Sequence, residues 1–489
     1  MDDKEDSKTV LECPLDYTLS DESGRELAKG PASGQLKKES LSIRPKAGEL
    51  LYLTYRDILG FSAQDYRIRL ELSSKEILTL CELGYRYEDF LRILSKLSNE
   101  LTLKDLLMNE SLKKTGVEME YEHTGLQNEA TGGGSGELRL YETGLVVIPE
   151  KGQLARIPYC EILDIQAKDF RLSVRTEHDG GWTFGAMGRS FEPAVETLTQ
   201  ATQELSQKVQ AMLKILLPEA DLASVRKLAR FMKEGRAAAK PDVENACPGT
   251  WVQLEKKLQL LGVKPEYDFL KALSRPEKLH LGLKRDLMGD LTEEYIWFLV
   301  PICGDPKKPG NAVAMEAATS NKEGKTGKAT YFFRIAPRKD YYRLAPAETD
   351  ALADLTIETV NRCMLAVNFR REPIYLPDER LDEPQYHRYW FAVRKIPQLR
   401  TLRELFIGRV IHSSQEQWER DVREILAFNI REKDDAAKWG KFREEPENKI
   451  PAPKGAVPSL EDKKGEGAAH PAKPAVKTSP KKSARRKRS

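Results

Sequence analysis

One stretch of this 489-residue sequence occurs twice, and this repeat limits the possible folds more than any other feature. Residues 55–70 align with residues 159–174 at an offset of 104, and six of the sixteen pairs are identical. Average composition would give about one identity by chance. The same offset pairs residues without a gap from Tyr17 and Tyr121 to Leu101 and Leu205. The sequence therefore predicts two copies of one folded unit.

Each copy begins with strand-like segments and ends with a helical one. Apolar residues alternate over 51–55 and 66–72, as in half-buried antiparallel strands. Near the turn at 73–75, the second copy has the hairpin signal Asp179-Gly180-Gly181. The spacing then becomes helical, with apolar residues at Phe90, Leu94, Leu97 and Leu101 and at Val195, Leu198, Leu205, Val209 and Met212. We predict a small barrel or sandwich closed by its terminal helix.

This layout resembles the pleckstrin-homology-like superfamily, including its bacterial branch, over about residues 10–110 and 114–217. The resemblance rests on strand order, unit length and the terminal helix, and neither helix has the Trp usual in the eukaryotic family. It implies two tandem small β-barrels, each closed by a C-terminal helix. Fold analogy alone does not give a function.

Many members of that superfamily bind phosphoinositides through a basic loop between the first two strands. The corresponding loops here would be about residues 20–34 and 124–136, and the second has no basic residue. The first balances Arg25 and Lys29 with three acidic residues. Because phosphate capture needs clustered Lys or Arg, we do not expect phosphoinositide binding.

The C-terminal half, residues 219–432, is predicted to be an α+β domain, and it resembles no family that we can name. Residues 237–248 are interpreted as a linker. Three strands should form an antiparallel meander over Tyr295–Ile302, Ala312–Thr319 and Thr330–Ile335. Helices are expected near 347–367, 383–395, 399–411 and 414–430. The whole chain is thus expected to be a multidomain α+β protein.

The sequence lacks the usual motifs of catalysis. It has no nucleophile elbow, zinc-binding His-x-x-x-His, Walker loop or dinucleotide fingerprint. The glycines at 132–136 are not followed by the Lys-Ser/Thr of a phosphate loop, and the six cysteines are too scattered for a zinc site or a disulfide framework. We therefore predict no catalytic residue, cofactor or metal, and an enzyme with its site in 219–432 is only the third hypothesis.

No apolar run approaches the roughly 20 residues that a membrane-spanning helix needs. The first ten residues hold six charged side chains and no apolar core, which is unlike a secretory signal. The expected location is therefore the cytoplasm.

The last part of the chain, about residues 433–489, is rich in Pro, Ala, Lys, Glu and Gly and should be disordered. Residues 477–489 hold seven basic residues and no acidic one. Because the net charge of the whole chain is +3, the remaining residues carry a net charge of 3 − 7 = −4. These possible polyanion contacts are Lys477, Lys481, Lys482, Arg485, Arg486, Lys487 and Arg488. The stretch Ser479-Pro480-Lys481-Lys482 resembles elements of linker-histone tails. The tail is either a solubilising segment or a weak contact for nucleic acid or an anionic membrane.

The leading hypothesis is a non-catalytic adaptor that binds protein partners through a strand edge or through the groove beside a terminal helix. The alternative is a protein that binds DNA or RNA non-specifically through its basic tail. No motif in the sequence identifies the partner.

Overall fold

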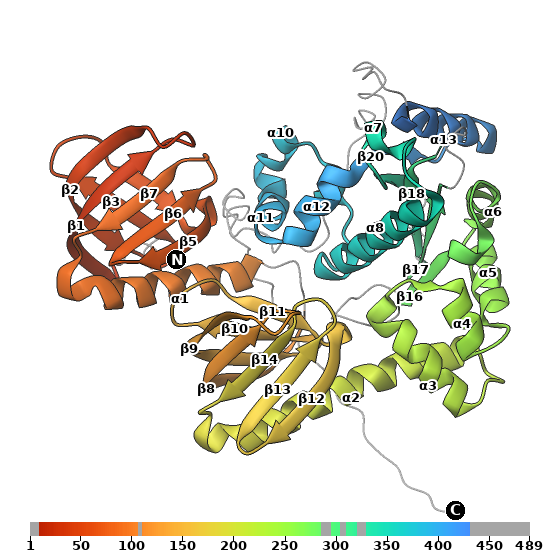
Figure 1. Ribbon diagram of the computed structural model, residues 1–489, viewed down its shortest axis with the longest axis horizontal. Helices are drawn as coiled ribbons and strands as arrows, with labels where there is room; N and C mark the ends of the chain where they lie inside the picture. Colours follow the sequence, from red (N-terminus) through yellow and green to blue (C-terminus); the bar gives the residue numbers. More distant parts are fainter. Residues whose placement is uncertain (1–8, 106–109, 285–294, 304–309, 320–328, 431–489) are drawn as a thin grey trace, which may run out of the picture. The chain divides into compact units, whose positions relative to one another are not determined.

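Three antiparallel sheets and the helices around them make up this mixed α+β protein, as the computed structural model shows (Figure 1). The structure describes residues 9–105, 110–284, 295–303, 310–319 and 329–430. The predicted disordered tail at 433–489 and its seven basic residues lie outside the described residues. None of the described helices combines the length and apolarity that crossing a bilayer requires.

The first sheet has seven strands in the order β4-β3-β2-β1-β7-β6-β5. Consecutive strands pair as hairpins except β4 and β5, which are the two edges, and the first strand also pairs with the last, as in Leu19 opposite Leu78. The strands are β1 (Leu11–Ser20), β2 (Glu26–Leu36), β3 (Ser40–Pro45), β4 (Leu51–Thr54), β5 (Ile58–Gln64), β6 (Arg67–Leu72) and β7 (Ile77–Cys81). The helix α1 (Tyr87–Asp105) follows directly.

The second sheet has the same order, β11-β10-β9-β8-β14-β13-β12, and is followed by the helix α2 (Phe191–Leu216). Its strands are β8 (Leu112–Thr124), β9 (Ala130–Tyr141), β10 (Gly144–Pro149), β11 (Ala155–Pro158), β12 (Ile162–Lys168), β13 (Arg171–Thr176) and β14 (Gly181–Gly185). From the second strand to the seventh, corresponding strands begin 104 residues apart, which is the offset of the sequence alignment. We call 11–105 the first repeat and 112–216 the second.

Backbone conformations also recur at this offset. Asp65 and Tyr66 both have positive φ, 50° and 57°, and the turn at Asp169 and Phe170 has 50° and 56°. Two consecutive left-handed residues make the tight turn that suits the twist of a hairpin. The turn therefore places Tyr66 and Phe170 at matching positions of the two repeats.

The terminal helices bury most of the apolar stripes that the sequence predicted, and Leu97 and Val195 are only partly buried. Phe90, Leu94 and Leu101 are buried in one cluster with strand residues such as Leu15 and Leu70. In the second repeat, α2 buries Leu198, Leu205, Val209 and Met212. Each helix therefore completes the core of its own sheet.

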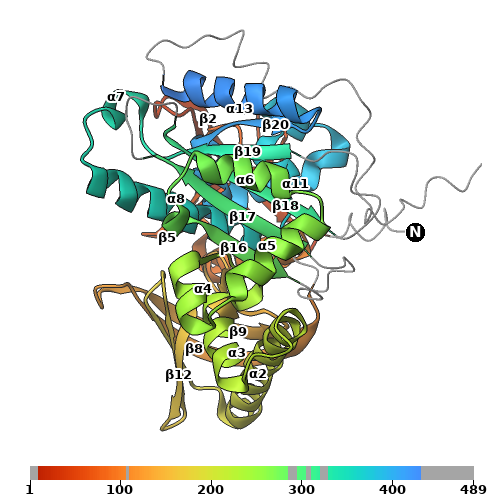
Figure 2. The ribbon, with the colours of Figure 1, turned by 90° about the vertical axis from the view of Figure 1, so that its right-hand side faces the viewer.

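The third sheet has six strands in the order β15-β16-β17-β18-β19-β20, and Figure 2 shows β16 to β19 side by side. They are β15 (Ala238–Ala239), β16 (His280–Lys284), β17 (Tyr295–Ile302), β18 (Ala312–Thr319), β19 (Ala329–Arg334) and β20 (Phe406–Ile411). Every residue of β17 is buried, which explains its continuous apolar run. The predicted meander is thus the centre of a larger sheet.

Helices precede and follow the third sheet along the chain. Before it comes α3 (Leu222–Phe231), and between β15 and β16 lie α4 (Lys240–Ala246), α5 (Thr250–Leu260) and α6 (Lys264–Ala272). After β19 come α7 (Arg338–Tyr341), α8 (Pro346–Ala366), α9 (Glu372–Tyr375), α10 (Asp378–Leu381), α11 (His387–Lys395), α12 (Pro397–Leu405) and, beyond β20, α13 (Gln415–Ile430). Both α6 and α8 contact β17, and α13 contacts β20.

Two predictions in this half of the chain are wrong. Residues 399–411 are not one helix, because α12 ends at Leu405 and 406–411 form β20 against β19. Here tertiary pairing outweighs the local helical pattern. The presumed linker 237–248 holds β15 and α4, and Pro241 suits the first turn of that helix.

Gly136 lies at a close approach between two strands of the second sheet, opposite Pro149. A Cβ at Gly136 would stand 2.4 Å from the backbone oxygen of Ile148, whereas a Cβ at Gly132 on the same strand would meet nothing within 4 Å. We expect Gly136→Ala to cost about 1–3 kcal/mol, because overpacking against a backbone atom forces the strands apart. Amide exchange in β9 and β10 should accelerate in this variant but not in Gly132→Ala. Equal protection in the two variants would contradict the tight approach.

Candidate binding sites beside the terminal helices

A groove of about 530 Å³ lies between β5 and the start of α1 in the first repeat. Tyr66 is 75% exposed at its edge and packs edge-to-face on Tyr87, with ring centroids 5.3 Å apart. The other lining residues are Phe61, Ala63, Gln64, Asp65, Glu88, Leu91, Lys151 and Gly152. The groove therefore combines aromatic and apolar walls with a charged rim, as a protein-binding surface does.

The strand β5 is one edge of the first sheet, so its outward backbone groups need partners from outside the sheet. At its beginning, the Ile58 oxygen accepts a 2.6 Å hydrogen bond from Lys395 Nζ, and the Leu59 oxygen accepts from Gln153 Nε2 at 2.8 Å. These side chains cover the part of the edge nearest α11. The groove lies farther along the same strand, from residue 61 onward.

In the second repeat, Phe170 matches Tyr66. Its side chain is 73% exposed and lies 5.7 Å from Phe191, measured between ring centroids. Tyr87 and Phe191 are themselves 104 residues apart. Both repeats therefore present an exposed aromatic ring that is supported by an aromatic side chain at the start of the terminal helix.

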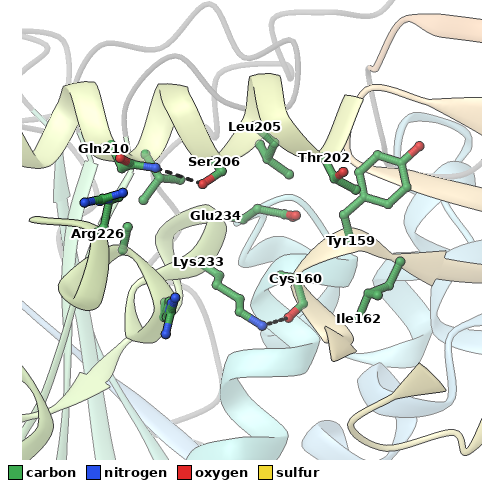
Figure 3. Close-up of a pocket in the computed structure, with 13 residues that line it drawn as sticks. Tyr159, Cys160, Ile162, Thr202, Leu205, Ser206, Gln210, Arg226, Lys233 and Glu234 are labelled. Carbon is green, nitrogen blue, oxygen red and sulfur yellow. Dashed lines mark hydrogen bonds between the residues drawn. The ribbon is translucent and has the colours of Figure 1, made fainter. Parts of the chain in front are cut away.

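A second hollow, of about 280 Å³, lies beside the C-terminal half of α2 (Figure 3). Residues from α2 form one of its walls, and the 3-10 turn Tyr159–Glu161 with the first residue of β12 forms another. The helix α3 with the short 3-10 turn Lys233–Gly235 forms the third. Its lining is Tyr159, Cys160, Ile162, Thr202, Leu205, Ser206, Val209, Gln210, Arg226, Ala229, Arg230, Lys233 and Glu234. The segment that follows the second repeat thus folds back and turns this side of the repeat into a cavity.

Local sequence explains how this wall is positioned. Asp221 caps α3 by accepting hydrogen bonds from the backbone nitrogens of Ala223 and Ser224. The helix ends at a turn in which Glu234 and Gly235 have φ of 52° and 91°. Lys233 Nζ then donates to the Cys160 oxygen at 3.1 Å. The turn is therefore anchored on the second repeat, with Glu234 facing the cavity (Figure 3).

Glu234 is an unusual buried acid. Its side chain is 1% exposed, and the hydrogen-bond donors that act on its carboxyl are the thiol and the backbone of Cys160. Burial raises the pKa of Glu234 to about 8, and nearby Glu110 acts in the same direction, against the opposing effects of Arg156 and Cys160. Arg156 is engaged elsewhere, since its Nη2 donates to Glu110 at 2.8 Å. Glu234 therefore keeps its proton at neutral pH.

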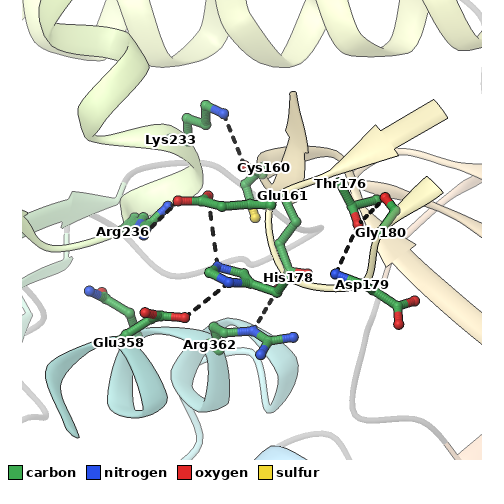
Figure 4. A network of polar contacts seen from close by, with 12 residues as sticks. Cys160, Glu161, Thr176, His178, Asp179, Gly180, Lys233, Arg236, Glu358 and Arg362 are labelled. Atoms are coloured by element: carbon green, nitrogen blue, oxygen red, sulfur yellow. Dashed lines mark hydrogen bonds and ion pairs between the residues drawn. The ribbon is translucent and has the colours of Figure 1, made fainter. Parts of the chain in front are cut away.

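Polar contacts join the second repeat to the helix α8 (Figure 4). His178 Nδ1 lies 3.0 Å from a carboxylate oxygen of Glu358, and Arg362 Nε donates to Glu161 at 3.0 Å. A third pair, Arg236 with Glu177 at 2.9 Å, ties the segment after the turn to the same hairpin. These partly buried pairs are arranged to hold surfaces together.

A histidine between two carboxylates occurs in the third sheet. His412, directly after β20, lies 3.3 Å from Glu266 and 3.0 Å from Glu316. Thr330 Oγ1 donates to Glu316 at 2.7 Å. Burial acts to lower the pKa of His412, but the hydrogen bonds and charges of the two glutamates outweigh it and raise the pKa to about 9. A histidine that is protonated at neutral pH is suited to an ion-pair network and not to base catalysis at that pH.

The sequence-based site prediction and the structure concern different parts of the chain. The seven basic residues at 477–488 lie outside the described residues. In the described ranges, no group of three or more Asp, Glu, His or Cys side chains could hold a metal ion. Sequence reasoning missed Glu234 because nothing in its local pattern distinguishes it from a surface glutamate.

Comparisons with known proteins give little further information. No protein-family model matches the sequence, and no curated protein matches it. One similar solved structure is that of the Spt16D Pob3N heterodimer. The matched chain shares 16% identity, the match covers 35% of this chain and 86% of that one, and the TM-score is 0.15. A TM-score at this level does not establish a shared fold.

The pKa of His412 predicts a pH dependence of stability. The pKa of His412 is about 9 in the folded protein and about 6.5 in an unfolded chain. The stabilisation that protonated His412 gives to the folded state is therefore complete below about pH 6.5 and is lost as pH rises toward 9. The melting temperature of the wild type should therefore fall toward that of His412→Gln over this window.

The histidine His280 provides the control, because burial lowers its pKa and it does not titrate between about pH 7 and 9. His280→Gln should keep the wild-type slope in this range. If the melting temperatures of the wild type and of His412→Gln depended on pH in the same way, the assignment would be contradicted.

Proposed function

We propose that the chain is a non-catalytic binding or scaffolding protein whose two repeats are pleckstrin-homology-like modules that bind other proteins. The observation that carries the proposal is the groove beside α1, where Tyr66 stands next to the edge strand β5. Exposed tyrosine and phenylalanine side chains are frequent anchors of protein interfaces. Phe170 gives the second repeat a matching anchor.

The shared strand order and the terminal helix after the seventh strand support the module assignment. Under this proposal, residues 10–110 and 114–217 are the modules and 219–432 are a third domain. The third domain holds the modules through two contacts. Lys395 donates a hydrogen bond to the backbone of β5 in the first module, and Arg362 donates to Glu161 in the second. A scaffold needs such fixed spacing between its binding surfaces.

The proposed ligand is an extended segment of a partner protein. Residues 61–64 at the end of β5 would pair with its backbone, and the walls from Tyr66 to Leu91 would receive its apolar side chains. The ion pair between Lys151 and Glu88 spans the rim between the two repeats. The partner would therefore contact both repeats.

The proposal predicts that the exposed aromatic residues are needed for partner capture. Tagged full-length chain should recover specific proteins from an extract of its own cells, and Tyr66→Ser combined with Phe170→Ser should lose them, because both anchors are removed. Tyr52→Ser is the control, since Tyr52 is 60% exposed on β4 at the opposite edge. A photo-crosslinking residue at position 66 should form a covalent adduct with the partner protein, and one at position 52 should not. Recovery of nothing above a tag-only sample, or equal recovery by all variants, would contradict the proposal.

The second proposal is non-specific nucleic-acid binding through the basic tail, which the seven basic residues in 477–489 favour. Deletion of 473–489 should abolish retention on DNA at low salt. If all seven cations contact phosphates, the logarithm of affinity should fall with the logarithm of salt concentration with a slope of about −6. Unchanged retention of the deletion variant on DNA would contradict this proposal.

A further inference from the structure

The two repeats contact each other through one turn and one helix face. The turn between β10 and β11, residues 149–154, lies against α1. Asn99 Nδ2 donates to the Gly152 oxygen at 2.9 Å, and the Leu154 nitrogen donates to Asn99 Oδ1 at 3.0 Å. The Gly152 nitrogen donates to Ser95 Oγ at 3.2 Å. The second repeat therefore covers α1 at Ser95 and Asn99, which are both buried.

The first repeat has the same turn at the offset of 104. Residues 45–50 connect β3 to β4 as residues 149–154 connect β10 to β11. The φ of Gly48 is 118° and that of Gly152 is 122°, so the two turns share a conformation that favours glycine. Residues 46–50 are all exposed, and Leu50 is 53% exposed. The first repeat therefore presents at its surface the kind of turn with which the second repeat binds α1.

The second repeat has the matching helix face. Thr199 and Gln203 of α2 lie 104 residues after Ser95 and Asn99, and they keep the hydroxyl and the amide group. Both side chains are exposed. At the bulge of the edge strand β12, Leu163 is 54% exposed as well. The duplication thus leaves one turn and one helix face exposed, and each is half of the contact that joins the repeats.

We propose that copies of this chain associate head to tail, with the turn 45–50 of one copy on the α2 face at Thr199 and Gln203 of the next copy. As in the internal contact, the Gln203 amide donates to the Gly48 oxygen and accepts from the Leu50 nitrogen. The two surfaces differ from each other, so the contact is heterologous and continues into a row of copies or closes into a ring. None of these residues lines the groove at Tyr66, so this inference does not depend on the protein-binding proposal.

The contact between copies is weaker than the internal contact. Ala47 takes the place of Lys151, which forms a 2.5 Å ion pair with Glu88. Glu49 takes the place of Gln153, so the hydrogen bond that Gln153 donates to the edge strand is not repeated. The internal contact is also tethered, and a short tether supplies an effective concentration of about 1 mM. Association between copies is therefore reversible and depends on concentration.

Sedimentation equilibrium of the full chain tests the proposal. The weight-average mass should rise with concentration from the monomer mass of 55.5 kDa and should exceed the dimer mass at about 1 mM, because each added copy brings a new turn and a new helix face. A mass that stays at 55.5 kDa over this range, or one that stops at a dimer, would overturn the proposal.

Matched variants test the two halves of the contact. Gln203→Arg should lower the association constant at least about tenfold, because two hydrogen bonds are lost. Gln200→Arg is its control on the same helix, since the counterpart Lys96 stays exposed beside the second repeat. On the turn, Gly48→Val should weaken association similarly, because a φ of 118° disfavours valine, and Gly24→Val in another exposed turn is its control at φ 84°. Equal association of Gln203→Arg and Gln200→Arg would contradict the assignment.

A mixture of variants tests the polarity of the contact. Gln203→Arg keeps its turn, and Gly48→Val keeps its helix face. At a concentration at which each variant alone is monomeric, the equimolar mixture should form a dimer with one copy of each variant, and this dimer should not grow. A mixture that stays monomeric would overturn the head-to-tail arrangement.

Discussion

The burial of each terminal helix on its own sheet is the interaction on which the rest of the structure depends. A sheet of short strands has one face that must be covered, and the apolar stripe of α1 covers it with Phe90, Leu94 and Leu101. The same stripe recurs in α2. Because the helix ends the repeat in both cases, each repeat can form its core from its own residues. The remaining surfaces, namely the edge strands and the hollows beside the helices, are then left for contacts with other segments.

Those surfaces are used in different ways in the two repeats. In the first, Lys395 and Gln153 cover only the beginning of β5, and the groove at Tyr66 stays open. In the second, the segment after α2 folds back beside the helix and lines a hollow with it. One architecture thus provides a groove beside α1 that borders an edge strand and a hollow beside α2 that is lined in part by the following segment. This difference arises from what packs on each repeat and not from the sheets themselves.

Local pattern accounts for what the sequence could predict. The alternating strands and the helical stripes are properties of neighbouring residues, and with the offset of 104 they located the later strands of both repeats and the meander of the third sheet. The loops expected at about 20–34 and 124–136 were wrong, because β2 begins at Glu26 and β9 at Ala130. Residues 406–411 were misread because they pair with β19, which lies more than 70 residues earlier in the sequence. Glu234 was missed for a related reason, since its burial depends on α2 and β12, which precede it in the chain. The resemblance to a known superfamily supplied an expected arrangement but no ligand.

The central claim is that each repeat is a unit stabilised by its own terminal helix. Amide hydrogen exchange on the full chain tests it most directly, with Phe90→Ala compared with Arg92→Ala at an exposed position of the same helix. Truncation of a buried Phe costs about 3–5 kcal/mol, so exchange should accelerate throughout β1 to β7 and α1 in Phe90→Ala while β8 to β14 keep their protection. Faster exchange confined to α1, or spread equally over both sheets, would contradict the claim.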